Sequence, residues 1–310
     1  MLYTEMIAEY LLDCRVRNLS KRTIESYKSQ LNVFYGYLRD VHGLNEISEV
    51  SKLHLKQFIL NCQEEGKKET YINTILKAVK LFYKYMTNEY EVTNITKEIK
   101  LLKEPKLLLT TFSDTEVSSL IKFYNKKGFV NQRNKLIIEV MADAGLRAEE
   151  VRNLTNDNVK EGYFQFMGKG SKERVVKISP YLEQSLKRYR RTKAGYFNNL
   201  RNYREIDDFL FISKSGRRLK NNVLLEKVVK DACIATNVRE EVQRKSCHSL
   251  RHYYAQKLLK NGVNLYTISR LLGHSNIKTT QTYLNSLSDS EILSSMELTP
   301  LQKLINEGVL

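Results

Sequence analysis

The sequence predicts a mainly α-helical protein of two domains, with a small antiparallel β-sheet in the second domain. Apolar residues recur at three- and four-residue spacing through most of the chain, which is the period of a helix packed on one face. Strand-like patterns are confined to two short segments. The chain of 310 residues is long enough for two domains, each with its own core, and a hydrophobic content of 42% is ordinary for a globular protein.

Residues 1–98 are predicted to form the first domain, almost wholly helical. A helix is expected to begin after Ser20, because apolar residues then follow at helical spacing from Ile24 to Leu38. A similar stripe predicts another helix over 71–85, and a shorter one is expected over 48–60. Since the aromatic residues in these stripes have the helical period, we interpret them first as core.

A linker is predicted over residues 99–108, between the two domains. The segment around it is dense in charge and contains Pro105, which favours extended backbone crossing exposed space. Ser113 and Glu116 then have the chemistry of a helix start. We therefore assign residues 109–310 to the second domain.

The sheet of the second domain is expected in two places. Phe164 and Phe166 alternate with polar neighbours, and Val175, Val176 and Ile178 follow after a turn rich in glycine and lysine. This pattern over 163–178 predicts a β-hairpin, and the run 209–212 (Phe-Leu-Phe-Ile) predicts a second short strand. The architecture is then a helical bundle with a small antiparallel sheet at one edge.

The net charge of +16 comes from 51 Lys and Arg against 35 Asp and Glu. It is uneven, because residues 1–100 carry a net charge of +2 and residues 101–310 one of +14. Such a surplus favours a polyanionic partner, since binding phosphates releases condensed counterions. Charge alone does not separate DNA from RNA, from an anionic membrane or from a merely soluble basic surface.

A cytoplasmic location without membrane insertion is expected. No apolar run approaches the ~20 residues of a membrane span, and the first residues lack a signal-peptide pattern. The four cysteines are scattered, without the spacing of a zinc site or a disulfide framework, and are interpreted as reduced thiols.

The second domain carries a series of side chains suited to phosphodiester chemistry. They are Arg147, Lys169, His248, Arg251, His274 and Tyr283. His248 and Arg251 are three residues apart, so a helix would place them on one face. Asn261-Gly262 is expected to end that helix, and the next one to run from after Asn264 to just before His274.

Each of these groups has a task in cleaving a DNA strand. Arginine binds phosphate oxygens bidentately and stays charged, so Arg147 and Arg251 are the candidates for neutralising the two non-bridging oxygens. His248 and His274 are candidates for further donors or proton carriers near neutral pH. The set requires no metal and no cofactor, because arginine and lysine would carry the charge that two metal ions supply elsewhere.

The attacking and leaving oxygens also have candidate partners. Tyr283 would be the nucleophile, forming a covalent phosphotyrosine. Lys169, at the hairpin tip, would protonate the leaving 5′ oxygen as general acid. Lys172, on the same turn, is a rival for that role.

With these motifs the chain resembles a tyrosine recombinase of the phage-integrase and Xer-like family over nearly its whole length. The family boxes G-L-R-x-x-E, G-K-G, H-x-L-R-H and L-L-G-H, with a tyrosine nine residues after the last histidine, are all present in order. The resemblance assigns Glu150 a supporting role beside Arg147; the alternative is a surface carboxylate paired with a neighbouring base. Glu149 and Tyr253 depart from the family pattern, which has smaller residues there more often.

The resemblance implies a core-binding (SAM-like) helical domain and a catalytic domain that close as a C-shaped clamp on double-stranded DNA. The implied activity is metal- and ATP-independent site-specific recombination through a 3′-phosphotyrosyl intermediate, either in integration and excision of a mobile element or in Xer-like resolution. A homotetramer acting on two DNA sites is implied as well. An accessory DNA-bending or directionality protein stays open, as does whether the segment around Pro300 docks on its own domain or on a neighbouring protomer.

Two other functions stay open at this point. A type IB topoisomerase would use the same chemistry but would relax one duplex as a monomer. An architectural DNA-binding protein with a decayed site is the second alternative, against which the intact set of reacting groups argues. The basic segment 187–191 is either a solvated helix face or a phosphate contact.

Overall fold

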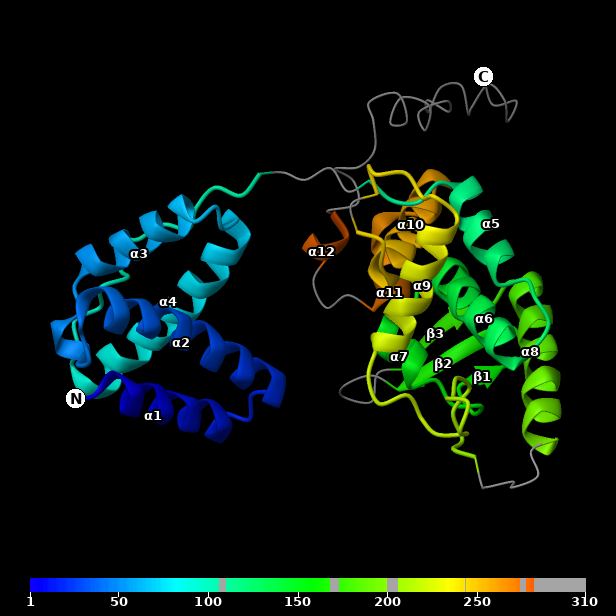
Figure 1. The fold of residues 1–310 in the computed structure, drawn as a ribbon, viewed down its shortest axis with the longest axis horizontal. Helices are drawn as coiled ribbons and strands as arrows, with labels where there is room; N and C mark the ends of the chain where they lie inside the picture. Colours follow the sequence, from blue (N-terminus) through cyan, green and yellow to red (C-terminus); the bar gives the residue numbers. More distant parts are fainter. Residues whose placement is uncertain (106–109, 168–172, 200–205, 243, 274–276, 282–310) are drawn as a thin grey trace, which may run out of the picture. The chain divides into compact units, whose positions relative to one another are not determined.

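The computed structural model describes residues 1–105, 110–167, 173–199, 206–242, 244–273 and 277–281. The chain divides into two compact units, Met1–Leu107 and Leu108–Leu310. Each unit has a hydrophobic core of its own, and the ribbon in Figure 1 shows the elements of both.

Over residues 1–105, the first unit consists of four α-helices and one short 3₁₀ turn around a core rich in aromatic side chains. The elements are α1 (Tyr3–Val16), α2 (Lys21–His42), η1 (Ile47–Glu49), α3 (Lys52–Glu64) and α4 (Glu69–Tyr90). α2 and α4 pack on each other, and each also contacts α1 and α3.

The sequence signals around α2 are confirmed. The Ser20 hydroxyl accepts a hydrogen bond from the Thr23 N–H at 3.2 Å, which caps the first turn. Gly43 ends the helix in the left-handed conformation, with φ of 67°. The helical stripe predicted as core includes Leu31, Phe34 and Leu38, all of which are fully buried.

The segment after α4 contacts the first unit at Ile99 and Leu102, while most of its other side chains are exposed, as expected of a linker. The Asn73 side chain donates to the Leu102 carbonyl at 2.9 Å and accepts from the Leu102 N–H at 2.8 Å. It also donates to the Glu104 carboxylate at 2.8 Å, and Ile99 is buried against the same core. Residues 99–104 are therefore held on the first unit, because the buried Asn73 amide binds the Leu102 backbone and Ile99 adds apolar contact.

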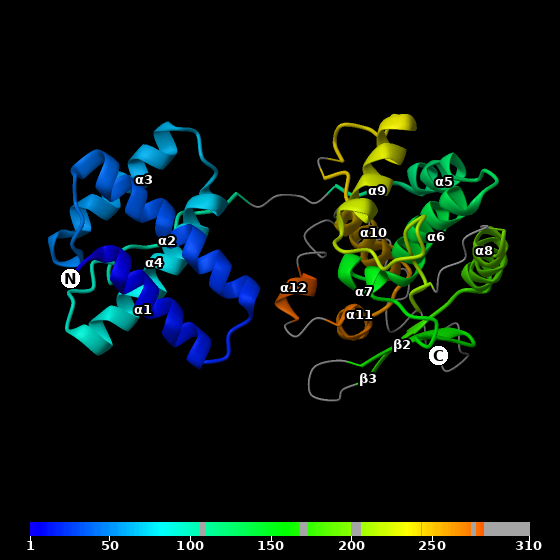
Figure 2. The same ribbon diagram turned by 60° about the horizontal axis from the view of Figure 1, so that its bottom comes forward.

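The second unit contains eight helices and three strands among its described residues. Its helices are α5 (Asp114–Phe123), α6 (Phe129–Ala144), α7 (Ala148–Arg152), α8 (Pro180–Asn198), α9 (Val223–Ala235), α10 (Cys247–Lys260), α11 (Leu265–Leu272) and α12 (Lys278–Gln281). α6 lies at the centre, in contact with α5, α8, α9 and α10 (Figure 2). Ser113 caps α5 as predicted, accepting from the Glu116 N–H at 3.2 Å.

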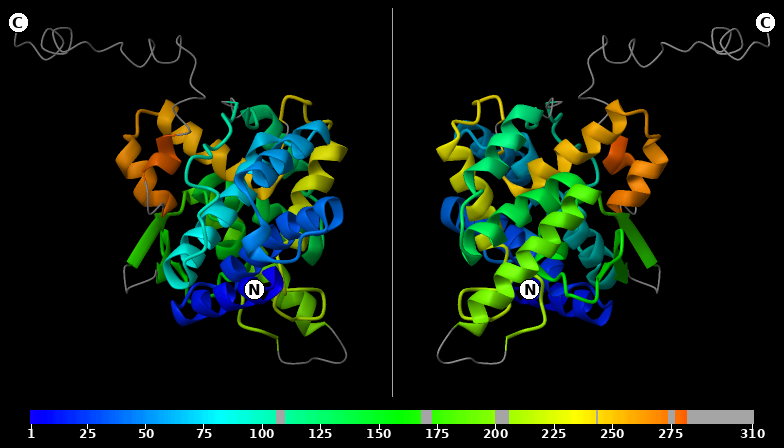
Figure 3. Two further views of the ribbon diagram at one scale, coloured as in Figure 1. Left: turned by 90° about the vertical axis from the view of Figure 1, so that its left-hand side faces the viewer. Right: turned by 90° about the vertical axis from the view of Figure 1, so that its right-hand side faces the viewer.

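The three strands form one antiparallel sheet in the order β1 (Val159–Lys160), β2 (Tyr163–Met167), β3 (Glu173–Lys177). Phe164 of β2 pairs with Val176 of β3, and both are fully buried against the helices. β3 lies beside α11 (Figure 3). The predicted hairpin is confirmed, and β1 is an addition that the sequence did not indicate.

The prediction of a strand over 209–212 is wrong. Only Ile212 takes part in a β-bridge, with Arg218. The backbone carbonyls of this run are bound by side chains from helices instead: the Tyr189 hydroxyl donates to the Leu210 carbonyl at 2.9 Å, and Arg133 donates to the Ile212 carbonyl at 2.9 Å. A short apolar run is compatible with any buried segment whose polar groups find partners, and here the partners are not a strand.

The helix ends in the last third of the chain follow the predicted signals. Gly262, with φ of 77°, follows α10, and the Asn264 side chain accepts from the Thr267 N–H at 2.8 Å to cap α11. Gly273 ends α11 in the left-handed conformation. In the part of the chain that the structure describes, no helix has both the length and the apolar composition to cross a bilayer.

Candidate active site

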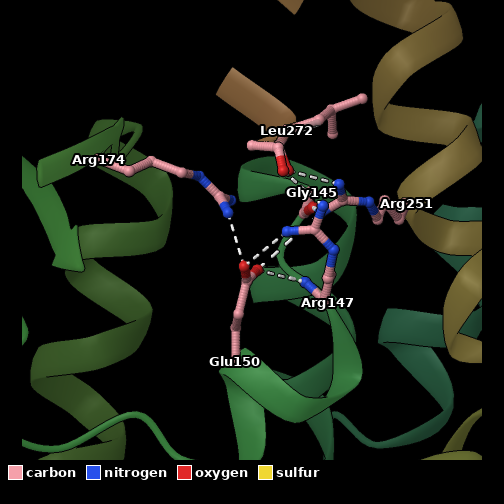
Figure 4. Close-up of polar contacts among 7 residues, drawn as sticks. Gly145, Arg147, Glu150, Arg174, Arg251 and Leu272 are labelled. Carbon is pink, nitrogen blue, oxygen red and sulfur yellow. Dashed lines mark hydrogen bonds and ion pairs between the residues drawn. The ribbon is translucent and has the colours of Figure 1, made fainter. Parts of the chain in front are cut away.

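Glu150 holds Arg147 at the start of α7. Arg147 is the N-cap residue of this helix, directly after the turn that ends α6. One Glu150 oxygen, Oε2, accepts from the Arg147 backbone N–H at 2.7 Å, and the other, Oε1, accepts from Arg147 Nη1 at 2.9 Å. A single carboxylate thus orients both the backbone and the guanidinium of Arg147 (Figure 4).

Arg251 reaches the same place from α10 and is almost fully buried, with 2% of its surface exposed. Its Nη1 donates to the Gly145 carbonyl at 2.8 Å and its Nη2 to the Leu272 carbonyl at 2.6 Å. Arg251 Nη1 also lies 3.9 Å from Glu150 Oε2. These acceptors compensate the burial of the charge and fix the plane of the guanidinium.

The carboxyl end of α11 binds both guanidinium groups. Leu272 accepts from Arg251, and the next carbonyl along the chain, that of Gly273, accepts from Arg147 Nη2 at 2.7 Å. Carbonyls in the last turn of a helix lack partners within the helix and carry the negative end of its dipole, so they suit cations. The G-L-R, H-x-L-R and L-L-G segments therefore meet in space.

A third guanidinium in the cluster, that of Arg174, was missed by the sequence reasoning. Arg174 Nη1 donates to Glu150 Oε1 at 2.6 Å, and its guanidinium carbon lies 5.5 Å from the centre of the Phe166 ring. The available signal was the alternation of β3, since Val176 is buried and Val175 is 47% exposed. Arg174 shares the inner face with Val176, and an inward-facing arginine requires an acidic partner.

The cluster has a surplus of positive charge. Three guanidinium groups surround one carboxylate, within 4.0 Å of it in each case. Burial raises the pKa of Glu150, but the charges of Arg174 and Arg147 and the Arg147 backbone N–H outweigh it and hold that pKa below its usual range. With Glu150 ionised, three positive charges face one negative charge, and a phosphodiester anion would reduce the imbalance.

His248 lies in the first turn of α10, three residues before Arg251, as predicted. Desolvation, together with the charges of Arg251 and Arg244, lowers the pKa of His248 below its usual value. Its ring centre is 4.1 Å from that of His252. A lowered pKa keeps the imidazole neutral near pH 7, so that one ring nitrogen donates and the other accepts.

Sequence profiles of known protein families match both units of the chain. The sequence profile of the phage integrase family matches residues 110–289, and that of the phage integrase N-terminal SAM-like domain matches residues 7–90. The chain belongs to the phage integrase family. It is thus a tyrosine recombinase, as its motifs suggested, and the mainly helical fold with a small sheet is confirmed.

Relatives of this recombinase include tyrosine recombinase XerD of Oceanobacillus iheyensis, which is 29% identical over 86% of this chain and 88% of its own length. Tyrosine recombinase XerC of Lacticaseibacillus casei is 26% identical over 86% and 89%. Among solved structures, a lambda integrase (75-356) dimer bound to a COC′ core site matches with a TM-score of 0.74 at 13% identity, covering 93% of this chain and 97% of that one. XerH bound to its palindromic difH substrate matches at 0.71 and 20%, covering 91% and 81%.

Three predicted site residues of the recombinase lie outside the described residues. These are Lys169, His274 and Tyr283, and Lys172, the alternative to Lys169, lies outside the described residues as well. The described structure thus brings together Arg147, Arg251 and Glu150, with His248 on the same helix as Arg251. Among the residues that the structure describes, no group of three or more His, Cys, Asp or Glu has a metal-binding arrangement.

Proposed function

We propose that this recombinase cleaves DNA at a phosphate held by Arg147 and Arg251, with Tyr283 as the nucleophile. The observation that carries the proposal is the convergence of these two guanidiniums at the carboxyl end of α11, next to Glu150. Arginine donors fixed in advance stabilise the charge that develops on the non-bridging oxygens, and removing one such donor typically costs ~10²–10³ in rate.

The remaining groups have the following roles in the proposal. Glu150 orients Arg147, as its two hydrogen bonds to that residue support. His248 and His274 donate hydrogen bonds to the phosphate or carry protons. Lys169 gives a proton to the leaving 5′ oxygen.

The reaction conserves bond energy at each step. The Tyr283 hydroxyl gives its proton to one of the two histidines, and its oxygen forms a bond to phosphorus. The bond from phosphorus to the 5′ oxygen breaks at the same time, and Lys169 protonates that oxygen. In the second step a 5′ hydroxyl attacks the 3′-phosphotyrosine and releases the phenol. Because the ester is exchanged for an ester, no ATP is needed to drive the reaction, and the arginines carry the charge that metal ions supply elsewhere.

DNA is the proposed partner of both units. In the first unit a groove of about 740 Å³ between α2 and α4 is lined by Arg22, Lys77 and Lys80 together with hydroxyl and amide side chains. Such residues are the usual donors to phosphate oxygens, which supports a DNA-binding role for residues 1–98. We further propose that the two units close as a clamp on the duplex and that four protomers act on two sites.

A nicked suicide substrate tests the proposal, because loss of the short fragment beyond the nick traps the covalent intermediate. Wild-type protein is expected to give an adduct that resists denaturation by detergent. Tyr283→Phe is expected to bind the same DNA with equal affinity and to give no adduct. An adduct of normal yield with Tyr283→Phe would refute the role of Tyr283, and supercoil relaxation without recombined product would favour a topoisomerase.

A further inference from the structure

Arg174 approaches the arginine cluster from an element that the motif residues do not occupy. It lies on β3, opposite Phe166 in the antiparallel register, while Arg147 and Arg251 come from α7 and α10. Its Nη1 donates to Glu150 Oε1 at 2.6 Å, the same oxygen that accepts from Arg147 Nη1 at 2.9 Å. The two arginines therefore share one acceptor, as Figure 4 shows.

Arg174 also fills the space between the sheet and the end of α11. A Cβ atom added to Gly273 would lie 2.8 Å from Arg174 Nη1 and 3.1 Å from its Cδ, and 3.4 Å from Arg147 Nη1. Gly273 is the residue whose carbonyl binds Arg147. Arg174 thus packs against the turn that orients Arg147 and contacts the carboxylate that orients it as well.

The surroundings of Arg174 leave its guanidinium little freedom. Its side chain is 14% exposed, and the Phe166 ring covers one face of it. Among the described residues, its Nε and Nη2 atoms have no hydrogen-bond partner. In the described part of the chain, the Glu150 carboxylate is the acidic group that Arg174 contacts, and the two groups hold each other in place.

We propose that Arg174 is a positioning residue for strand cleavage, which fixes the Glu150 carboxylate and thereby the Arg147 guanidinium at the end of α11. The inference rests on the proposed function, because the position of Arg147 matters only if Arg147 binds the phosphate. Arg174 acts through Glu150 in this scheme and does not itself touch the reacting atoms.

Electrostatics gives this role a signature in the pH dependence of cleavage. The charged groups facing Glu150 are Arg147 at the start of α7, Arg174 on β3 and Arg251 on α10. His248 on α10 is a further titratable group, which responds to the charges of Arg251 and Arg147. Among the groups that lower the pKa of Glu150, Arg174 has the largest effect, and burial opposes it. Without Arg174, Glu150 is expected to become protonated at a higher pH than in the wild type, and the protonated carboxyl no longer holds Arg147.

The test is single-turnover cleavage of the nicked suicide substrate by the full-length protein across pH. Arg174→Gln is expected to slow cleavage by about 10- to 100-fold, the range that corresponds to losing one charge-assisted hydrogen bond, with DNA affinity unchanged. As pH is lowered, the rate of Arg174→Gln is expected to begin falling at a higher pH than the wild-type rate does. This decline on the acid side of the pH profile is the acid limb. Arg174→Lys, which keeps the charge, is expected to retain the wild-type acid limb at a reduced rate.

A double-mutant comparison separates action through Glu150 from independent action. Glu150→Gln removes the titration of Glu150. The part of the acid limb that disappears in this variant therefore belongs to Glu150 and not to His248. Arg174→Gln combined with Glu150→Gln is expected to cleave within about twofold of Glu150→Gln alone, because contacting residues couple. Arg217→Gln is the matched control, since Arg217 pairs with Asp207 at 3.1 Å on the surface of the same unit; it is expected to cleave at the wild-type rate.

Several outcomes would overturn the inference. A wild-type rate and acid limb for Arg174→Gln would show that it positions nothing, and multiplying losses in the double variant would show that it acts independently of Glu150. A loss explained wholly by weaker DNA binding would make it a contact residue. If Arg174→Gln does not fold, Arg174→Lys decides the matter through its rate: a reduced rate with the wild-type acid limb supports positioning, and a wild-type rate refutes it. Absence of any wild-type adduct would instead refute the proposed function itself, and this inference with it.

Discussion

The turn at Gly145 offers a quantitative test of how the cluster is built. Gly145 ends α6 with φ of 59°, and its carbonyl accepts from Arg251 Nη1 at 2.8 Å. A Cβ atom at this position would lie 2.2 Å from Cδ1 of the Tyr254 ring and within 2.9 Å of two further ring atoms. Gly145→Ala therefore adds two penalties, a left-handed conformation for a residue with a Cβ atom and a steric clash in a packed site.

The magnitudes of the two penalties can be separated. The left-handed conformation costs roughly 1–2 kcal/mol for alanine, and overpacking typically costs about 1–3 kcal/mol, so the variant should lose about 2–5 kcal/mol of unfolding free energy. Gly262→Ala is the matched control, because Gly262 has φ of 77° and nothing within 4 Å of the added atom. It is expected to lose only the first part, about 1–2 kcal/mol.

Denaturant unfolding followed by circular dichroism measures both variants against wild type. Gly145→Ala is expected to be the less stable by about 1–3 kcal/mol, and its cleavage rate should also fall because Arg251 loses its alignment with the Gly145 carbonyl. Equal losses for the two variants would refute the close packing of Tyr254 on Gly145. Normal cleavage by a strongly destabilised Gly145→Ala would refute the positioning of Arg251 by this turn.

Glu150→Gln is expected to slow cleavage by about 10- to 100-fold at unchanged DNA affinity, since Arg147 loses a charged acceptor; an unchanged single-turnover rate would contradict this. The pKa of Glu150 is lowered in the folded state. Its contribution to the free energy of unfolding should therefore be complete at pH values above the ordinary pKa of a glutamate, about 4.3, and vanish as pH falls through the lowered pKa. Comparing unfolding of wild type and Glu150→Gln across pH checks this, and a contribution that grows in acid would have the wrong sign. Cleavage should persist in EDTA, and strict dependence on Mg²⁺ would count against charge neutralisation by arginine. Removal of residues after Asp289 should spare binding of one protomer but impair assembly on paired sites in gel-shift assays; normal synapsis would exclude a role of the tail.

Local sequence signals predicted the parts of the site that local structure determines. The pairing of Glu150 with Arg147, which the family resemblance implied, is a capping contact between residues three apart at the start of one helix. The spacing of His248 and Arg251 on α10 follows likewise from helical periodicity, and Gly273 marked the end of α11. These features depend on a few neighbouring residues and on well-known preferences of helix ends.

Features that depend on distant segments were not predictable in the same way. The acceptors of Arg251 are backbone carbonyls of Gly145 and Leu272, and every residue has a carbonyl, so no residue type announces such contacts. Arg174 was detectable only from the alternation of inward-facing and outward-facing side chains along β3. The sequence analysis used this alternation for the apolar residues of the strand alone. The prediction of a strand over 209–212 failed because side chains from two helices bind the carbonyls of this run. Apolar composition does not reveal such partners.

The central claim is that a phosphate held by Arg147 and Arg251 becomes linked to Tyr283. Protease digestion of the trapped adduct, followed by mass spectrometry of the peptide that retains the nucleotide, locates the bond directly. One modified peptide is expected, with the 3′ phosphate on the Tyr283 oxygen. A phosphate on any other residue, or an unmodified Tyr283 peptide in an adduct of full yield, would contradict it.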